Sequence, residues 1–341
     1  MHTADFDYHL PPERIAHSSI EPRDHAKLLV INRKTSSMED KHVFDLPDYL
    51  EAGDILVLND SKVFRARFFA QKANGTRIEL LFHKPLDEHT WEVLAKPAKK
   101  LHEDEVITLD GGATARIQSK DPVAGTVTLT LDLETEAFFA YSDLHGDVPT
   151  PPYVQATEAT KAGYQTVYAK NTGSVAAPTA GLHITDRLLE ALQQKGVRIA
   201  YVTLHVGIGT FRPMQDGDVA QHVMHSEWAH VPADTAERIH QAKAGGKRVI
   251  AIGTTATRAL EGAAQHTGTL SEWSGWTKIF ITPGYTFRVI DGLMTNFHLP
   301  KSTLLVLVSA LLGRERTLAS YAHAIEREYR FYSFGDAMLI V

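Results

Sequence analysis

The sequence predicts an α/β fold, as a barrel-like or open α/β domain into which a small all-β barrel is inserted. Strand and helix patterns alternate from about residue 150 to the end of the chain, which is typical of a mostly parallel sheet. Between residues 62 and 149 the pattern changes to closely spaced short strands, which indicate a small barrel or sandwich. We therefore predict a discontinuous α/β domain, residues 1–61 and 150–341, and an inserted antiparallel β-barrel domain, residues 62–149.

Two buried strands are predicted before the insertion. The apolar runs 26–32 and 54–59 both end in polar residues, as strands of a covered sheet do. Inside the insertion, turn signals at 74–75, 110–112 and 121–122 separate alternating segments. These segments are 77–82, 91–95, 106–109, 113–117 and 126–131.

The part after the insertion begins with a helix over 185–194, whose apolar face carries Leu188, Leu189 and Leu192. A strand over 198–205 and a polar loop over 207–227 follow it. The other expected elements are helices over 232–244, 257–265, 302–312 and 318–329 and strands over 248–253, 278–282 and 338–341.

Composition excludes several classes of protein. The chain has no cysteine, which rules out disulfides, thiolate metal sites and cysteine nucleophiles. The first residues lack the basic and apolar regions of a signal peptide, and the longest apolar run, 303–313, is too short to cross a bilayer. We expect a cytoplasmic protein without a membrane segment. The net charge of −6 argues against a non-specific nucleic-acid binder.

Charge is unevenly distributed in the insertion. Residues 62–102 carry nine Lys and Arg against four Asp and Glu, whereas residues 103–147 carry two against ten. We interpret the two stretches as solvated faces. The alternative is a contact with an RNA backbone made by Arg65, Arg67, Lys72, Lys96, Lys99 and Lys100.

Polar residues gather where the predicted strands end, which is where sites form in parallel α/β folds. Asn59 and Asp60 end one strand, and Thr210 and Arg212 follow the strand that ends at His205. Thr254 stands at a strand-to-helix turn, where it either holds an anion or a ribose hydroxyl or simply caps the helix. Other polar segments are 179–183, 282–285 and 295–302.

One histidine pair superficially resembles a metal motif. His222 and His225 are one residue too close for the zinc pattern H-E-x-x-H, and no Glu lies between them. The remaining functional interpretation is acid–base chemistry by His225 or Glu227. The residues alone therefore indicate an α/β enzyme with a polar site, and they leave the substrate open.

Many segments, in order and nearly end to end, resemble the S-adenosylmethionine:tRNA ribosyltransferase-isomerases of queuosine biosynthesis. The matching segments are 6–8, 10–12, 22–24, 53–60, 164–170, 177–183, 203–213, 224–227, 253–255, 283–285, 295–303 and 334–339.

The resemblance implies a reaction in which the ribosyl part of S-adenosylmethionine moves onto 7-aminomethyl-7-deazaguanine. That base stands at the wobble position of tRNA with a GUN anticodon. The sugar is rearranged to an epoxycyclopentanediol, giving epoxyqueuosine, and adenine and methionine leave. S-adenosylmethionine is thus a substrate, and we expect no cofactor, no metal and a monomer.

The reaction needs a base beside the sulfonium and an acid for the departing adenine. We predict that the acid–base residues come from His183, His205, His225, Glu227 and His298. We expect Glu227→Gln to abolish turnover with little loss of folding. The predicted substrate-binding residues are Asn59, Thr210, Thr254 and Asn296 for sugar hydroxyls, Asp60 beside them, and Arg212 and Arg258 for a carboxylate or phosphate.

Two aromatic residues are candidates for holding the wobble base, which has to leave the RNA stack. Tyr285 or Phe297 either stacks on that base or packs in the core. Two rival functions stay open at this point. A sugar-phosphate isomerase or lyase would turn over without RNA, and a non-enzymatic RNA-binding protein would need a basic surface.

Overall fold

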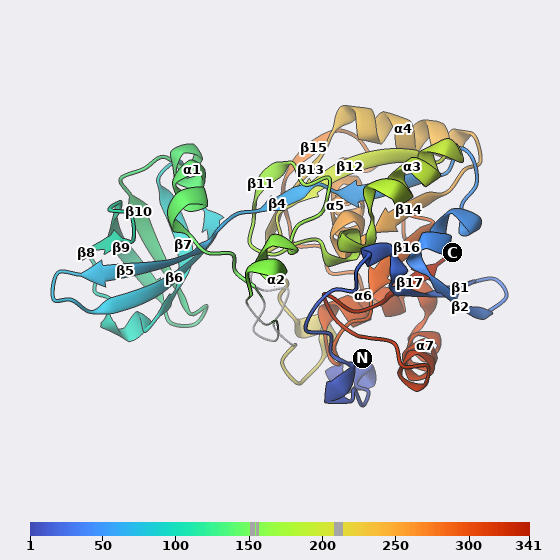
Figure 1. Ribbon diagram of the computed structural model, residues 1–341, viewed down its shortest axis with the longest axis horizontal. Helices are drawn as coiled ribbons and strands as arrows, with labels where there is room; N and C mark the ends of the chain where they lie inside the picture. The colour runs from blue at the N-terminus through green and yellow to red at the C-terminus, as the bar shows by residue number, and fades with distance from the viewer. Residues whose placement is uncertain (151–153, 155–156, 208–213) are drawn as a thin grey trace. The chain divides into compact units, whose positions relative to one another are not determined.

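The computed structural model describes residues 1–150, 154, 157–207 and 214–341, which form two compact units (Figure 1). The large unit comprises Met1–Ser61, Pro152–Asn171 and Ala177–Val341. The barrel unit comprises Lys62–Pro151 and Thr172–Ala176. The predicted fold class is confirmed, because an α/β unit is interrupted by a closed antiparallel barrel.

The barrel unit is built on six antiparallel strands. Their inward side chains alternate along the chain, and the helix α1 (Thr135–His145) adds Phe138 to the same core. The ring of Phe138 lies 4.5 Å from that of Phe82 and 5.2 Å from that of Trp91, between centroids. Neither α1 nor the first strand of the barrel was predicted from the sequence. The barrel order is β10 (Thr126–Leu131), β7 (Thr90–Lys96), β6 (Arg77–Pro85), β5 (Arg67–Lys72), β8 (Val106–Leu109) and β9 (Thr114–Asp121).

The large unit contains a nine-stranded sheet. Its central strands β12, β3, β14 and β16 are parallel, whereas β13, β15 and β2 pair antiparallel at the two ends. β17 runs antiparallel to β16 and parallel to β1, so the sheet is mixed rather than mostly parallel. The order is β15 (Trp273–Thr277), β13 (Glu227–Val231), β12 (Arg198–Leu204), β3 (Ile55–Asn59), β14 (Val249–Ile252), β16 (Gly292–Asn296), β17 (Ala337–Ile340), β1 (Lys27–Ile31) and β2 (Met38–His42).

Helices cover both faces of this sheet. On one face Leu56 and Ile250 pack in a cluster with Leu188 and Leu192 of α3 (Asp186–Gln194). The alternate residues of the same strands, such as Val57, are also fully buried. α4 (Ala233–Ala244) and α5 (Gly253–Thr267) contact β3, β12 and β14 and contribute nothing to the α3 cluster, so they cover the other face.

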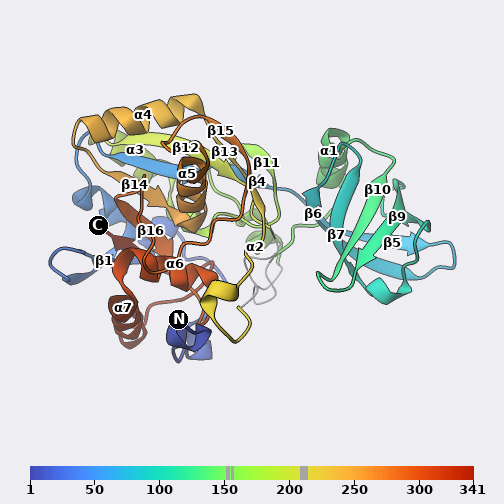
Figure 2. The same cartoon turned by 180° about the vertical axis from the view of Figure 1, so that it is seen from behind.

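The remaining elements are short or lie beside the sheet. α6 (Thr303–Leu312) and α7 (Arg314–Glu326) pack on each other (Figure 2). β4 (Ser61–Val63) pairs with β11 (Asn171–Ser174), and α2 is Glu158–Ala162. Within the described ranges the 3₁₀ helices are Thr3–Phe6, Pro12–Arg14, Arg23–His25, Val43–Tyr49, Ala98–Lys100, Thr179–His183 and Val219–Gln221.

Several predicted elements need correction. The strand predicted over 278–282 is wrong: Ile279 and Ile281 are buried outside any strand, and the strand β15 ends just before them. β13 occupies the end of the predicted loop and the residues after it. α5 begins at Gly253 and α7 at Arg314, each four residues earlier than predicted.

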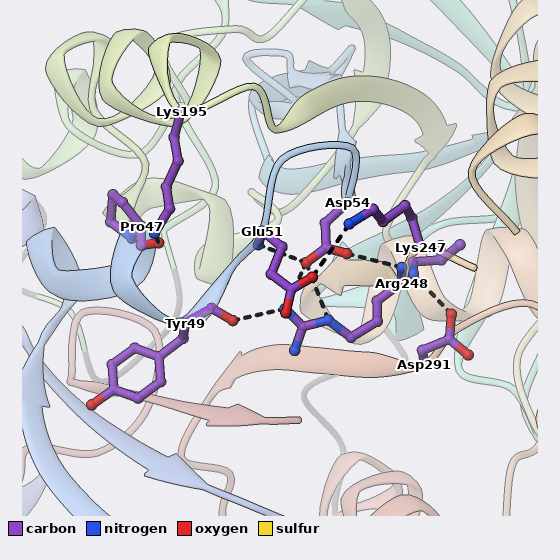
Figure 3. A network of polar contacts seen from close by, with 9 residues as sticks. Pro47, Tyr49, Glu51, Asp54, Lys195, Lys247, Arg248 and Asp291 are labelled. Atoms are coloured by element: carbon purple, nitrogen blue, oxygen red, sulfur yellow. Dashed lines mark hydrogen bonds and ion pairs between the residues drawn. The ribbon is translucent and has the colours of Figure 1, made fainter. Parts of the chain in front are cut away.

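A polar network fastens the amino ends of β3 and β14 (Figure 3). The buried carboxylate of Asp54 accepts hydrogen bonds from the main-chain N of Glu51 at 2.9 Å and from Nη2 of Arg248 at 2.6 Å. Burial alone would raise the pKa of Asp54, but these donors outweigh it and lower that pKa. Asp291 adds a bond to the main-chain N of Val249 at 2.8 Å. This edge of the sheet is therefore held together by polar contacts within the chain.

Candidate functional site

A pocket lies at the opposite edge, where β14 and β16 end. It holds about 750 Å³ of empty space, part of it open to solvent. The predicted residues Thr254, Asn296 and His298 all line it, so the structure brings three of the predicted site residues together. Its other walls are residues 177–180, Val206, Gly253, Thr255, Thr295, 297, 299–300, Ser302, Leu304, Tyr332 and Ser333.

Asn296 is oriented by two partners. The hydroxyl of Thr179 donates to its Oδ1 at 3.0 Å, and its Nδ2 donates to Nε2 of His183 at 3.1 Å. An amide nitrogen only donates, so Nε2 accepts and the proton of the neutral imidazole lies on Nδ1. Burial lowers the pKa of His183 to about 4, and the nearby charges of Arg330 and Arg23 lower it too. His183 is therefore uncharged at neutral pH and positions Asn296 from behind the pocket wall.

His298 faces the pocket directly. Its Nε2 lies 3.0 Å from the hydroxyl of Thr295, and its main-chain N–H donates to the hydroxyl of Tyr321 at 3.0 Å. Tyr8 donates to the main-chain carbonyl of the same residue. Burial lowers the pKa of His298 to about 3. A fixed, neutral imidazole thus lies at the pocket, able to exchange a hydrogen bond or a proton with a ligand.

Tyr332 and Ser333 line the pocket but were missed by the sequence analysis. Tyr332 has φ 79°, in the left-handed region that residues with a Cβ rarely adopt and that clusters at functional sites. Burial raises the pKa of Tyr332 to about 12, so its hydroxyl is protonated at neutral pH. The one available signal was the family-like segment 334–339 directly after them, because backbone strain leaves no mark in the sequence.

Glu227 and Arg258, predicted for catalysis and for substrate binding, bind each other in a buried ion pair. The main-chain N of Gly207 also donates to Oε1 of Glu227 at 3.1 Å, next to the pocket-lining residue Val206. Arg258 lies one turn after Thr254 on α5. Burial lowers the pKa of Arg258 to about 10, which leaves it charged at neutral pH. The pair therefore supports one wall of the pocket.

The other two predicted histidines are not among the described residues that line the pocket. His205 stacks on Trp228 with 5.1 Å between ring centroids, and burial lowers the pKa of His205 to about 4. His225 is exposed, three residues after His222.

Asn59 and Asp60 join β3 to β12. Oδ1 of Asn59 accepts from the main-chain N of Leu204 at 2.9 Å, and Nδ2 donates to the Leu204 carbonyl at 3.0 Å. The carboxylate of Asp60 accepts from the hydroxyl of Thr203 at 2.7 Å and from the amide of Asn171. Their side chains thus have protein partners, and their predicted contact with substrate stays a prediction.

The two aromatic candidates also have protein partners. The Tyr285 hydroxyl donates to Glu261 at 2.9 Å. Phe297 borders the pocket, but it is fully buried, with its ring 5.0 Å from that of Phe331. These contacts favour the core-packing alternative for Phe297. Thr210 and Arg212 lie outside the described residues.

The structure weakens the RNA-contact alternative for two basic residues of the barrel unit. Lys72 is buried, donates to the carbonyl of Lys100 and pairs with Glu105 at 3.0 Å. Arg67 pairs with Glu79 at 3.4 Å. The remaining four candidates are exposed, and no ion pair within the described ranges includes them: Arg65, Lys96, Lys99 and Lys100.

The described ranges hold neither a metal-binding cluster nor a membrane-spanning helix. Outside the gaps at 151–153, 155–156 and 208–213, no three His, Asp or Glu residues gather in a way that could hold a metal ion. No helix in the same ranges combines the length and the apolar character that crossing a bilayer requires.

Comparison with known proteins decides the family. The family model described as queuosine biosynthesis protein matches residues 3–340. The chain belongs to this family. A member from Halothermothrix orenii, named S-adenosylmethionine:tRNA ribosyltransferase-isomerase, is 47% identical over 342 residues, covering 100% of both chains. A protein of the same name from Synechococcus elongatus is 48% identical, over 100% of this chain and 96% of its own.

A solved structure supports the same family. The crystal structure of S-adenosylmethionine tRNA ribosyltransferase from Thermotoga maritima is similar with a TM-score of 0.58 and 34% sequence identity. The similarity covers 99% of this chain and 100% of that one. The queuosine-family resemblance expected from the short segments is thus confirmed over the whole chain.

Proposed function

We propose that this chain transfers the ribosyl group of S-adenosylmethionine onto 7-aminomethyl-7-deazaguanine in tRNA and isomerises it, giving epoxyqueuosine, adenine and methionine. One observation carries the proposal: Thr254, Asn296 and His298 meet in one pocket of a chain that matches ribosyltransferase-isomerases from end to end.

The charge state of the pocket suits a sulfonium substrate. S-adenosylmethionine carries a positive sulfur, which a charged imidazole would repel. The low pKa values of His183 and His298, about 4 and about 3, keep both rings neutral at physiological pH. We propose that His298 and Tyr332 hydrogen-bond the substrate in their neutral forms, while Thr254 and Asn296 bind its sugar hydroxyls.

The proposal extends to the RNA partner, the oligomeric state, the location in the cell and the need for a metal or cofactor. The RNA substrate is tRNA with a GUN anticodon, the enzyme acts as a monomer in the cytoplasm, and turnover needs neither a metal nor an organic cofactor. Undiminished turnover after dialysis against a chelator, and a single monomeric mass in solution, are the expected results.

The test is direct reconstitution. Purified protein is incubated with S-adenosylmethionine and tRNA carrying the aminomethyl-deazaguanine base, and the digested RNA is analysed by mass spectrometry while free adenine is measured. Epoxyqueuosine and adenine should form together and only with that tRNA. Adenine release without RNA would instead favour a small-molecule enzyme, and tRNA binding without any product would favour an RNA-binding protein.

A further inference from the structure

A second, smaller pocket lies beside the first. It is lined by Arg23, His183 and Arg330, among others, and shares Ser333 with the first pocket. His183 also connects the two, because its Nε2 accepts from Asn296, which lines the first. Residues of both pockets come from one tight loop, residues 330–336, which is closed by the bond from the main-chain N of Asp336 to the Arg330 carbonyl at 2.7 Å.

Among the described residues, the guanidinium of Arg330 in this second pocket forms no ion pair. Nη2 of Arg330 is buried and has no hydrogen-bond partner among the described residues, while Nη1 donates to the Ser18 carbonyl at 3.2 Å. Arg23 donates to the carbonyls of Gly163 and Gln165, and its Nε reaches only the well-exposed Glu21, at 3.4 Å. A buried guanidinium N–H without a partner is costly, and an anionic ligand would remove that cost.

The acidic residues packed nearby are already engaged. Asp336 accepts from the main-chain N atoms of Lys27 and Arg330, at 2.9 and 2.7 Å. Asp24 is bound by Arg187 and by the hydroxyl of Thr185. Neither carboxylate accepts a hydrogen bond from Nη2 of Arg330, so an anionic ligand would be the partner of that atom.

The walls of the pocket favour a carboxylate on an aliphatic chain. They include the apolar side chains of Ile20, Leu182 and Phe334. That suits a short aliphatic chain ending in a planar anion, which a guanidinium binds bidentately. An RNA phosphate would bring a ribose on either side.

We propose that Arg330 and Arg23 bind the α-carboxylate of the methionine part of S-adenosylmethionine, whose adenosyl part occupies the first pocket. This inference rests on the proposed function. It assigns the carboxylate to Arg330 and Arg23 rather than to Arg258, which is already paired with Glu227.

The test compares S-adenosylmethionine with decarboxylated S-adenosylmethionine, which keeps the sulfonium and the adenosyl group. At saturating tRNA, adenine release gives KM for the first compound, and inhibition of that release gives Ki for the second. The wild type should bind the decarboxylated compound at least about tenfold more weakly. Arg330→Gln should raise the KM for S-adenosylmethionine at least about tenfold and leave the Ki of the decarboxylated compound within about twofold. The variant should therefore bind the two compounds about equally.

The matched control is Arg327→Gln, a neighbouring arginine that lines neither pocket and should change neither constant. If Arg330→Gln does not fold, Arg23→Gln tests the same prediction with the same two constants. The proposal would be overturned if Arg330→Gln weakened the binding of both compounds equally, or of neither. A rise confined to the KM for tRNA would reassign the pocket to an RNA phosphate. Wild-type protein without turnover would refute the proposed function itself, in which case calorimetric binding of the two compounds still tests this pocket.

Discussion

Glu227 on β13 and Arg258 on α5 form an ion pair in which both side chains are at least 94% buried. The same carboxylate accepts the main-chain N–H of Gly207, where the chain leaves β12 beside the pocket. One buried charge pair thus ties a strand, a helix and a pocket-forming turn together. Such a pair has a large desolvation cost, so its two members depend on each other.

Glu227→Gln should therefore lower the free energy of unfolding by about 3 kcal/mol, because it leaves Arg258 buried without its counter-charge. This differs from the small folding loss expected from the sequence alone. The double variant Glu227→Gln with Arg258→Met should regain at least half of that stability in denaturant unfolding, since both charges are gone.

Turnover of that double variant separates two roles for Glu227. If Glu227 performs acid–base chemistry, as the sequence analysis predicts, the refolded double variant should release no adenine. Wild-type turnover by a stable double variant would limit Glu227 to positioning. Glu237→Gln, which changes an exposed carboxylate on α4, is the matched control and should alter neither quantity.

Stability should fall as the pH drops from about 7 towards 4. Burial lowers the pKa values of His183 and His205 to about 4 and that of His298 to about 3. In the unfolded chain these groups titrate near 6.5, so between the two values the unfolded state binds more protons and stability rises with pH. Each histidine contributes up to roughly 1.4 kcal/mol per pH unit in that window.

Urea unfolding at pH 7, 6 and 5 measures this dependence. His298→Gln should flatten it by about one proton relative to the wild type. A free energy of unfolding that is constant or rises from pH 7 to pH 5 would contradict the buried, neutral state of these rings.

The sequence predicted the fold best where patterns are local and regular. Five barrel strands, five of the nine strands of the large sheet and the helices α3 to α7 follow from alternating or helical apolar patterns. The prediction over 278–282 failed because Ile279 and Ile281 are apolar and buried, yet the chain there makes no ladder. β13 was missed because it is a short strand that begins at the charged residue Glu227.

Asn296→Leu should reduce kcat/KM by about 100-fold, because it removes the donor to His183 and the acceptor for Thr179 at the pocket wall. We expect a stability loss of about 1–3 kcal/mol from the stranded polar groups. The control is Thr235→Val, which breaks the part-buried hydrogen bond from Thr235 on α4 to the Tyr201 carbonyl on β12 and should cost stability but not kcat/KM. Unchanged kcat/KM in folded Asn296→Leu would remove Asn296 from the site.

Asp54→Asn should lower the free energy of unfolding by about 2–3 kcal/mol while kcat/KM is kept, because Asp54 holds the sheet edge opposite the pocket. The lowered pKa of Asp54 means that its contribution is present at neutral pH and is lost as the pH falls below about 4. Denaturant unfolding at pH 7 and pH 3 should show the two proteins converging at the lower pH. A constant difference would contradict the charged pair.

The site was predictable only in part, for physical reasons. Thr254 follows β14, Asn296 ends β16 and His298 follows it. The carboxyl ends of these parallel strands share an edge, so the topology brings the three residues together, although β16 itself was not predicted. Glu227 and Arg258 carry the residue types of a site, and nothing in a sequence reveals that they bind each other. Tyr332 depends on a strained backbone angle, and the missing partner of Arg330 Nη2 depends on which acceptors the fold brings near it.

The central claim is that S-adenosylmethionine donates its ribosyl group. The most direct measurement uses two isotopic forms of it, one with ¹³C in the ribosyl carbons and one with ¹³C in the methyl group, each with the aminomethyl-deazaguanine tRNA. We predict that the modified nucleoside gains the mass of the labelled ribosyl carbons from the first form and no label from the second. Methyl label in the RNA, or product without ribosyl label, would contradict the account.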